Sequence, residues 1–253
     1  MKPIIFCAAL ALNLIATGVS QAAPISGQGT WQTTLQARDL NGDGIADAFY
    51  DTVLNITWAR DANANGAMTW ATANTWANNY SIGGITNWRL PTMIDTGAPG
   101  CSPAASIAGG TDCGYSPQTR AGGITYSELA HLYYVTLGDL PACTPGLTTC
   151  VTLANHGLLN SGNFLNFQLD RYWIGLEYIA PSTNRAWVFT TAINGGSGAQ
   201  DAYNKTLSLF ALAVKDGDVG AAIPIAPTAV LIAPFLALLA WKRRVHSKQP
   251  HSI

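Results

Sequence analysis

The residues best suited to chemistry lie in the short stretch Asp39–Asp47, which reads DLNGDGIAD. With glycine at position 6, oxygen-bearing side chains occupy positions 1, 3, 5 and 9 of this stretch: Asp39, Asn41, Asp43 and Asp47. This is the first part of a calcium-binding loop, in which the glycine permits a sharp turn and a backbone carbonyl, here that of Ile45, adds an oxygen. The pattern therefore predicts a bound Ca²⁺ with a structural rather than a catalytic role.

The same stretch has a second interpretation. The bidentate ligand that calcium loops carry at position 12 is missing, because Tyr50 stands there and Asp51 follows one place later. Asp, Asn and Gly residues also favour solvated turns between two strands. A calcium loop and a simple polar turn therefore both remain open at this point.

Aromatic side chains are the second set of candidates, because an aromatic face is a good apolar platform for a sugar ring. The tryptophans concerned are Trp58, Trp70, Trp88, Trp173 and Trp187. Burial in the core is the more frequent role of such residues, and we expect it for most of them. Trp76 points away from the buried face of its predicted helix and is the best exposed candidate.

Arg89 follows Trp88 directly and precedes Pro91. We expect Arg89 to anchor the turn ahead of the proline by bonding backbone or an aspartate, with ligand binding as its alternative role. The candidate ligand-binding residues are thus Trp76, Trp88 and Arg89.

Glu128 and Glu177 are the only glutamates. Glu128 is expected to cap a helix. Glu177 could form an acid/base couple with Asp170 or Asp201, or an ion pair across neighbouring strands with an arginine, Arg171 or Arg185. Because the sequence shows no nucleophile motif, the ion pair is favoured and no catalytic residue is assigned.

The cysteines indicate an oxidising compartment. Cys7 lies in the first segment of the chain, and four others follow: Cys101, Cys113, Cys143 and Cys150. Four cysteines allow three disulfide pairings. We favour the short loops 101–113 and 143–150, because each lies in a glycine- and proline-rich stretch without other restraint. A zinc site is the rival interpretation, but the spacings differ from the close pairs of zinc ribbons.

The elements that must position these residues are strands and two helices. Residues 35–57 have strand character around a tight polar loop. A helix over about 70–80 begins at the cap Thr69, and a second one begins at a Thr125/Glu128 capping box and ends at Gly138. The buried stripe of the second helix comprises Leu129, Leu132, Tyr133 and Leu137. Strands are then predicted over 171–179, 185–191 and 207–214, which makes the fold class α+β.

The two ends of the chain resemble sorting segments. Residues 1–22 carry an early Lys2, an apolar run and small residues before a cleavage position after Ala22, as a secretory signal peptide does. Residues 221–241 hold no charge and are followed by Lys242, Arg243 and Arg244, which predicts a hydrophobic helix able to span a bilayer. One exported domain, 23–220, lies between them.

The charge of this domain excludes one class of partner. All 14 acidic residues lie in it but only eight of the 13 lysines and arginines do, so its net charge is −6. Proteins that hold nucleic acids need clustered basic side chains to displace counterions. Nucleic acid is therefore not expected as a partner.

Several motifs of the domain resemble the Lcl C-terminal domain family, over most of 36–218. The matching strings are YDTVLNITW at 50–58, MTWA at 68–71, WRLPT at 88–92, YW at 172–173, EY at 177–178, AWVF at 186–189 and AV at 213–214. The resemblance implies a C-type-lectin-like fold, with two helices packed on antiparallel strands, and adhesion to extracellular polymers. The negative charge argues against sulfated polysaccharides, and the calcium-site motifs of sugar-binding C-type lectins are absent.

The tail is similar to a PEP-CTERM sorting signal, which consists of a proline-containing tripeptide, an apolar span and arginines. Pro224 and Pro227 stand in the motif position, without the usual glutamate between them, and Lys242, Arg243 and Arg244 close the span. The resemblance implies processing by an exosortase-type enzyme and a place on the membrane, the cell surface or outside the cell.

These observations lead to one expected function and two alternatives. We expect a non-catalytic adhesion module that binds an extracellular polysaccharide or other matrix polymer. The alternatives are an enzyme on the same fold that uses paired reactive cysteines, and a purely structural matrix component.

Overall fold

The computed structural model describes residues 27–96, 112–147, 149–178, 184–192 and 196–222. Antiparallel sheets and a few short helices make up this part, so the predicted α+β class is confirmed. Several predicted features lie outside the described residues: the segment 1–22 that resembles a signal peptide, Cys101, and the tail 223–253 with Pro224, Pro227 and the basic cluster. Within the described ranges, no helix has the length and apolar character needed to cross a membrane.

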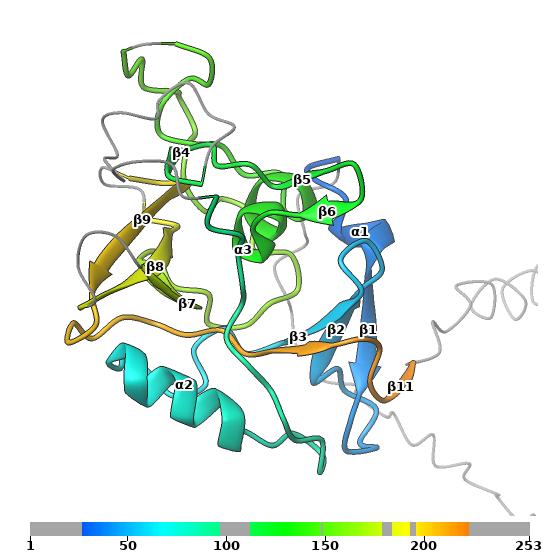
Figure 1. Cartoon of the computed structure of the whole chain (residues 1–253). Helices are drawn as coiled ribbons and strands as arrows, with labels where there is room; N and C mark the ends of the chain where they lie inside the picture. Colours follow the sequence, from blue (N-terminus) through cyan, green and yellow to red (C-terminus); the bar gives the residue numbers. More distant parts are fainter. Residues whose placement is uncertain (1–26, 97–111, 148, 179–183, 193–195, 223–253) are drawn as a thin grey trace, which may run out of the picture.

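The first sheet has five strands in the order β10-β3-β2-β1-β11, and all neighbours are antiparallel. Their bounds are β1 Leu35–Asp39, β2 Ala48–Asp51, β3 Ile56–Ala59, β10 Val214–Asp216 and β11 Ala221–Ala222. The short strand β11 pairs with β1 through Arg38↔Ala222, so the two ends of the domain lie side by side (Figure 1). Residues 221 and 222, predicted to begin the hydrophobic segment, therefore lie in a strand.

The second sheet has four strands in the order β4-β9-β8-β7. Their bounds are β4 Gly114–Tyr115, β7 Arg171–Tyr178, β8 Arg185–Thr190 and β9 Ala199–Asn204. A separate small hairpin pairs β5, Arg120–Ala121, with β6, Ile124–Thr125. The predicted strands 171–179 and 185–191 correspond to β7 and β8 and are confirmed.

The predicted strand 207–214 is wrong for most of its length. Leu209 and Phe210 form single bridges with Met68 and Tyr172, and regular pairing begins only at Val214 in β10. This segment passes from the edge of the second sheet into the first, and its residues 211–214 are buried. Residues 211–214 are therefore apolar because they are buried between the two sheets. An inner position in the four-stranded sheet, which an apolar strand would favour, is occupied by the polar strand β9.

Helix α2, Trp70–Asn79, begins where the sequence predicts. The Thr69 hydroxyl accepts a hydrogen bond from the Thr72 backbone N–H at 3.4 Å, which caps the first turn. A four-residue helix, α1 Trp31–Thr34, precedes β1. In α2, the Thr69 cap and the burial of Ala73 and Ala77 on one face stabilise the helix. They explain why this segment is helical although its interior contains four Asn and Thr side chains.

The second helix starts later than predicted. Helix α3, Glu128–His131, is capped by Ser127, whose hydroxyl accepts from the Ala130 N–H, and continues into the π-helix η1, Leu132–Thr136. The Thr125/Glu128 capping box is therefore wrong, because Thr125 belongs to β6 and the Glu128 carboxylate turns to another partner. The predicted buried stripe is confirmed, since each of its members is at most 2% exposed: Leu129, Leu132, Tyr133 and Leu137.

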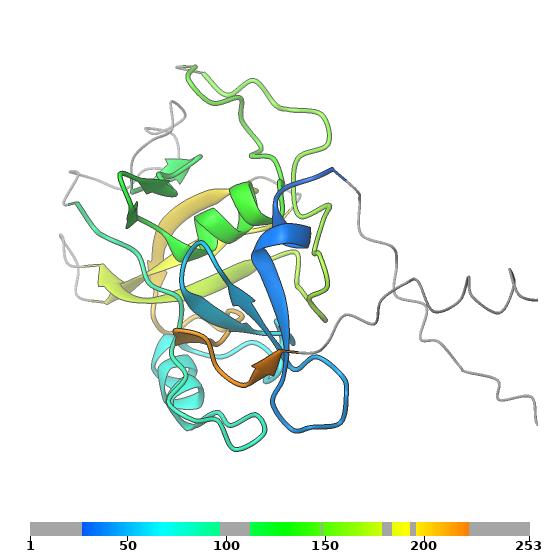
Figure 2. The same ribbon diagram turned by 90° about the vertical axis from the view of Figure 1, so that its right-hand side faces the viewer.

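The four-stranded sheet is covered on both faces. Alternate residues of β7 and β8, such as Ile174 and Trp187, pack with α3–η1 and the five-stranded sheet. The opposite face, which includes Trp173 and Val188, packs against α2 and residues 209–211. Figure 2 shows α2 and α3 on opposite sides of these strands. Burial on both faces fixes the register of this sheet.

Candidate functional site

The stretch Asp39–Asp47 forms the loop that joins β1 to β2. The carboxylate of Asp39 lies inside it: Oδ1 accepts hydrogen bonds from the backbone N–H of Asn41 at 3.2 Å and Gly42 at 2.7 Å, and Oδ2 accepts from Gly44 at 2.8 Å. These bonds, that of Gly44 first, lower the pKa of Asp39. The loop therefore holds Asp39 as a carboxylate.

The remaining polar side chains of the loop also turn inward. Backbone N–H groups of Asp43, Ile45 and Leu40 donate to Asn41 Oδ1, Asp43 Oδ1 and Asp47 Oδ2, at 2.8–2.9 Å. The Asn41 amide lies between two carboxylates, 3.2 Å from Asp43 Oδ2 and 3.5 Å from Asp47 Oδ1. The predicted ligand side chains thus converge, as both the calcium loop and the polar turn require.

The ligand expected at position 12 is not supplied by either neighbouring residue. The Tyr50 hydroxyl donates to Asn55 Oδ1, and the buried Asp51 carboxylate accepts from the N–H groups of Val53 and Leu54. In the part of the chain that the structure describes, no group of three His, Cys, Asp or Glu side chains is suited to a metal ion. The calcium site stays a prediction with five protein oxygens, one of them the Ile45 carbonyl.

An open hollow of about 510 Å³ adjoins this loop. One wall is the end of the loop, from Gly44 to Ala46, and the opposite wall is the segment from Asn163 to Leu165. Phe49 of β2 lies at its base and makes an edge contact with Phe164, with ring centroids 5.2 Å apart. The hollow therefore combines apolar side chains with polar backbone and amide groups.

Arg60 connects the two walls. Its Nη1 donates to the Ala46 carbonyl at 2.9 Å and its Nε to the Asn163 carbonyl at 3.5 Å. A smaller hollow of about 90 Å³ shares Ala37, Phe49 and Asn163 with the first and extends toward Trp31. We call the two neighbouring hollows together the β1–β2 groove.

The candidate tryptophans do not line this groove. Trp88 is 1% exposed, and its Nε1 donates to the Ile85 carbonyl at 2.9 Å. Trp76 is half-buried and packs on Tyr80, with ring centroids 4.9 Å apart. The burial of Trp88 contradicts its assignment as a ligand-binding residue. Trp76 is only half-buried, so its role as a platform for a ligand stays a prediction. The expected core role of Trp58, Trp173 and Trp187 is confirmed.

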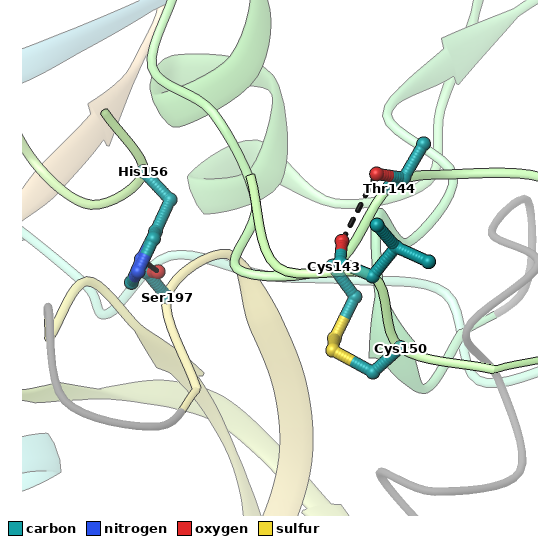
Figure 3. The surroundings of a disulfide bond; sticks show 6 residues. Cys143, Thr144, Cys150, His156 and Ser197 are labelled. Atoms are coloured by element: carbon teal, nitrogen blue, oxygen red, sulfur yellow. Dashed lines mark hydrogen bonds between the residues drawn. A yellow bond between two sulfur atoms is a disulfide. The ribbon is translucent and has the colours of Figure 1, made fainter. Parts of the chain in front are cut away.

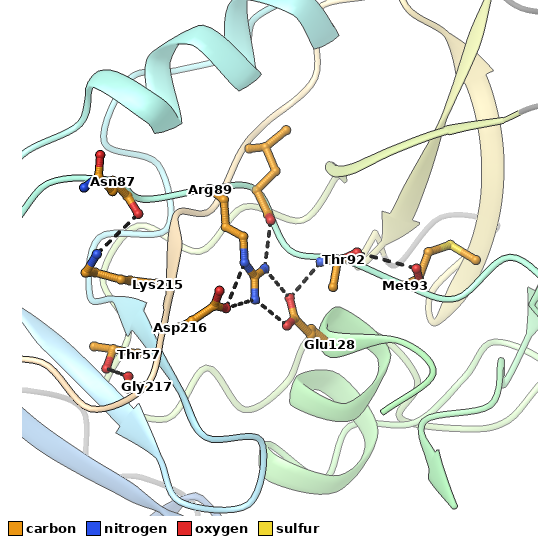
Figure 4. Close-up of polar contacts among 10 residues, drawn as sticks. Thr57, Asn87, Arg89, Thr92, Met93, Glu128, Lys215, Asp216 and Gly217 are labelled. Atoms are coloured by element: carbon orange, nitrogen blue, oxygen red, sulfur yellow. Dashed lines mark hydrogen bonds and ion pairs between the residues drawn. The ribbon is translucent and has the colours of Figure 1, made fainter. Parts of the chain in front are cut away.

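Arg89 is the centre of a charged network (Figure 4). Its guanidinium makes two 2.8 Å bonds to the Glu128 carboxylate, bonds Asp216 from Nε at 3.0 Å, and reaches the Leu90 carbonyl. Glu128 also accepts the Thr92 backbone N–H at 2.7 Å. Burial disfavours the charged guanidinium, but the two carboxylates outweigh it and raise the pKa of Arg89. The predicted anchoring role of Arg89 is confirmed. Through Glu128 and Asp216, Arg89 joins α3 to β10.

Glu177 forms an ion pair, as favoured, but with a different partner. Its carboxylate lies 2.6 Å from Lys205 Nζ, which also lies 4.9 Å from the centroid of the Trp70 ring. The predicted partners bond elsewhere: Arg171 lies 3.5 Å from Asp170, and Arg185 donates to a backbone carbonyl. Residues beyond the end of β9 bring Lys205 to Glu177, which no local pattern indicates.

The disulfide Cys143–Cys150 is confirmed (Figure 3). It joins two chain segments that are also bridged at Cys143↔Thr152. His156 Nδ1 and Ser197 Oγ, 2.7 Å apart, tie this disulfide hairpin to the segment before β9. Cys113 is disulfide-bonded too, and its predicted partner Cys101 lies outside the described residues. Both sulfurs of the 143–150 pair are therefore committed to each other and not to zinc.

Sequence reasoning missed the groove. Phe49, Arg60 and Leu165 belong to different strands and loops, and no spacing in the chain indicates that they meet. The calcium-loop pattern uses only the backbone carbonyl of Ile45, although its side chain is 58% exposed on the wall of the groove. An exposed isoleucine inside an otherwise polar loop is the one signal that points there.

No family model matches this chain, and no curated protein or solved structure matches it either. Function must therefore be argued from the geometry of the site. That geometry consists of an inward-facing acidic loop beside an open groove of mixed polarity.

Proposed function

We propose that this chain is an exported, non-catalytic binding module that holds an extracellular polymer, a glycan. The observation that carries the proposal is the β1–β2 groove, since concave sites with apolar walls and a few placed polar groups are the usual form of ligand sites. In this proposal the tail resembling a PEP-CTERM signal is recognised by an exosortase-type enzyme, and the domain acts on the cell surface or beyond it.

A C-type-lectin-like fold of the Lcl C-terminal type is part of the proposal. Helices α2 and α3 precede the antiparallel strands β7 to β9, which is the order that the resemblance implies. The strings YW at 172–173 and AWVF at 186–189 lie inside β7 and β8, and their aromatic side chains are buried. These two motifs of the resemblance therefore stand at core positions, as a shared fold requires.

The engagement of the charged side chains supports binding over catalysis. Glu128 and Asp216 both form ion pairs with Arg89, and Glu177 is paired with Lys205. An acid/base catalyst needs a carboxyl placed to exchange a proton with substrate, and these carboxylates are held by cations instead. The thiol-based alternative is disfavoured as well, because Cys113, Cys143 and Cys150 are disulfide-bonded.

We further propose that the loop Asp39–Asp47 holds a structural calcium ion. Its carboxylates already face inward, and Ca²⁺ would add charge compensation and stiffen one wall of the groove. Calorimetric titration of CaCl₂ into the protein tests this: Asp43→Ala is expected to lower the affinity at least about tenfold, while Asp170→Ala, outside the loop, leaves it unchanged. Equal heats from the parent and Asp43→Ala would refute the calcium site.

Two measurements test the main proposal. The mass of the mature protein recovered from the cell envelope is expected to lack residues 1–22 and to show oxidised cysteines; an intact, reduced chain in the cytosol would contradict export. On a broad glycan array the mature protein is expected to bind. Absence of binding to every glycan class would favour the structural alternative.

A further inference from the structure

We propose that the β1–β2 groove binds an uncharged saccharide, with one sugar ring between Ile45 and Leu165. This inference rests on the proposed function and adds to it the place of the site and the charge class of the ligand. None of the residues that carry it belongs to the sorting segments or to the motifs that resemble the Lcl family at Trp88.

The walls of the groove are held in place by backbone hydrogen bonds. Leu165 N–H donates to the Arg60 carbonyl and Ala62 N–H donates to the Leu165 carbonyl, both at 2.9 Å. Arg60 N–H in turn donates to the Asp47 carbonyl at 2.9 Å. The Asn163–Leu165 wall and the loop wall are thus both attached to one short segment after β3. A pre-formed site loses less entropy when it binds ligand.

The side chains in the groove match the two kinds of surface on a sugar ring. Ile45 and Leu165 are 58% and 39% exposed and offer apolar surface to the C–H groups of a ring. Arg60 carries five N–H donors, and two hydrogen bonds to carbonyls engage it in the described part of the chain. Its remaining donors and the Asn163 amide can bond ring hydroxyls.

The size of the groove suits a sugar ring in the main hollow. The main hollow, about 510 Å³, lies within the size range of small-molecule sites, and the second, about 90 Å³, is too small to hold a ligand alone. The main hollow is therefore the part of the groove that would hold a ring of the saccharide.

The charge around the groove selects against anionic polymers. The adjoining loop carries three carboxylates, those of Asp39, Asp43 and Asp47, and the groove itself holds one guanidinium, that of Arg60. A calcium ion in the loop would bring the sum of these charges to zero, and without the ion the sum is negative. Sulfate and uronate groups would therefore gain no attraction there and would be repelled from the ion-free loop, whereas hydroxyl groups meet no such penalty.

The test uses the mature, oxidised chain and an array of neutral and anionic oligosaccharides, followed by calorimetry with the best-bound neutral tetrasaccharide. The variants are Leu165→Ser and Ile45→Ser in the groove, and Leu207→Ser as a control, since Leu207 is 43% exposed outside the groove. We expect the groove variants to raise Kd at least about fivefold and the control to leave it unchanged, with thermal melting confirming that all variants fold.

Three results would overturn the inference, and they are distinguishable. Glycan binding that both groove variants leave unchanged would refute the site but not the proposed function. A preference for heparin or hyaluronan fragments over neutral ones would refute the charge class. Binding of no oligosaccharide of either kind would refute the proposed function together with the inference.

Discussion

The buried carboxylate of Asp139 makes the stability of this domain depend on pH. Asp139 is 2% exposed and follows the end of η1. Its Oδ1 accepts from the backbone N–H groups of Leu159 and Asn160, both at 2.9 Å, and from Gln28 Nε2 at 3.3 Å. Its Oδ2 is buried and has no hydrogen-bond partner among the described residues. The ionised form is therefore incompletely compensated.

Burial raises the pKa of Asp139 to about 7, although the hydrogen bonds from Asn160 and Leu159 act in the opposite direction. Between the unfolded value of 3.8 and the folded value of about 7, the folded state keeps a proton that the unfolded state has lost. The free energy of unfolding must then fall as pH rises through this window, at about 1.4 kcal/mol per pH unit. The whole shift corresponds to a loss on the order of 4 kcal/mol.

The perturbation that tests this is Asp139→Asn, which mimics the protonated acid and cannot ionise. We expect urea unfolding of the oxidised protein at pH 4.5, 5.5, 6.5 and 7.5 to show that the parent loses stability relative to Asp139→Asn as pH rises. A constant offset from the new amide does not affect this slope. Burial lowers the pKa of His131, so this residue makes the free energy of unfolding rise with pH. The contribution of His131 is the same in the parent and in Asp139→Asn, and it cancels when the two are compared.

Parallel curves for the two proteins would refute the reasoning. They would mean that Asp139 is ionised in the folded state throughout the range, so that its three hydrogen bonds outweigh its burial. A parent that gains stability relative to Asp139→Asn as pH rises would refute the sign of the shift as well.

Other predictions concern the Arg89 network and one close backbone contact. Arg89→Ala is expected to lower the free energy of unfolding, measured by urea denaturation, by about 2–3 kcal/mol, because the buried Glu128 carboxylate loses its cation. Asp216→Asn changes an exposed partner and should lower it by less than about 1 kcal/mol. Equal losses of stability from the two variants would contradict the difference in burial between Glu128 and Asp216. Gly138 has φ 73°, and a Cβ there would overlap the backbone of Gly29. Gly138→Ala should therefore lower Tm far more than Gly217→Ala, which has φ 75° and open space, and similar shifts would exclude the overlap.

Elements whose signals are local could be predicted from the sequence. The Thr69 cap, the apolar stripe that ends at Gly138 and the polar loop after β1 depend on residues a few places apart. The alternation in β7 and the short Cys143–Cys150 loop are of the same kind. Such signals survive without knowledge of the fold because the groups that interact are neighbours in the chain.

Elements that form only through contacts with distant parts of the chain could not be predicted from the sequence. Strand β9, with the sequence AQDAYN, is polar and forms because β8 offers it a pairing edge, whereas the apolar 207–214 is buried between sheets and pairs little. Trp88 was predicted as core or ligand platform, and only its surroundings decide for core. Propensity is a weak guide in such places, because tertiary packing overrides it.

The order of residues is enough to predict the α+β class, the spacing of oxygen ligands in the acidic loop, and the cysteine pair that closes the short hairpin. The contacts of Arg89 with Glu128 and Asp216, the pairing of Glu177 with Lys205 and the groove beside the loop depend on packing between distant segments. A groove is the space left between walls from separate parts of the chain. Its shape is set by how those parts pack and not by the order of residues within any one of them.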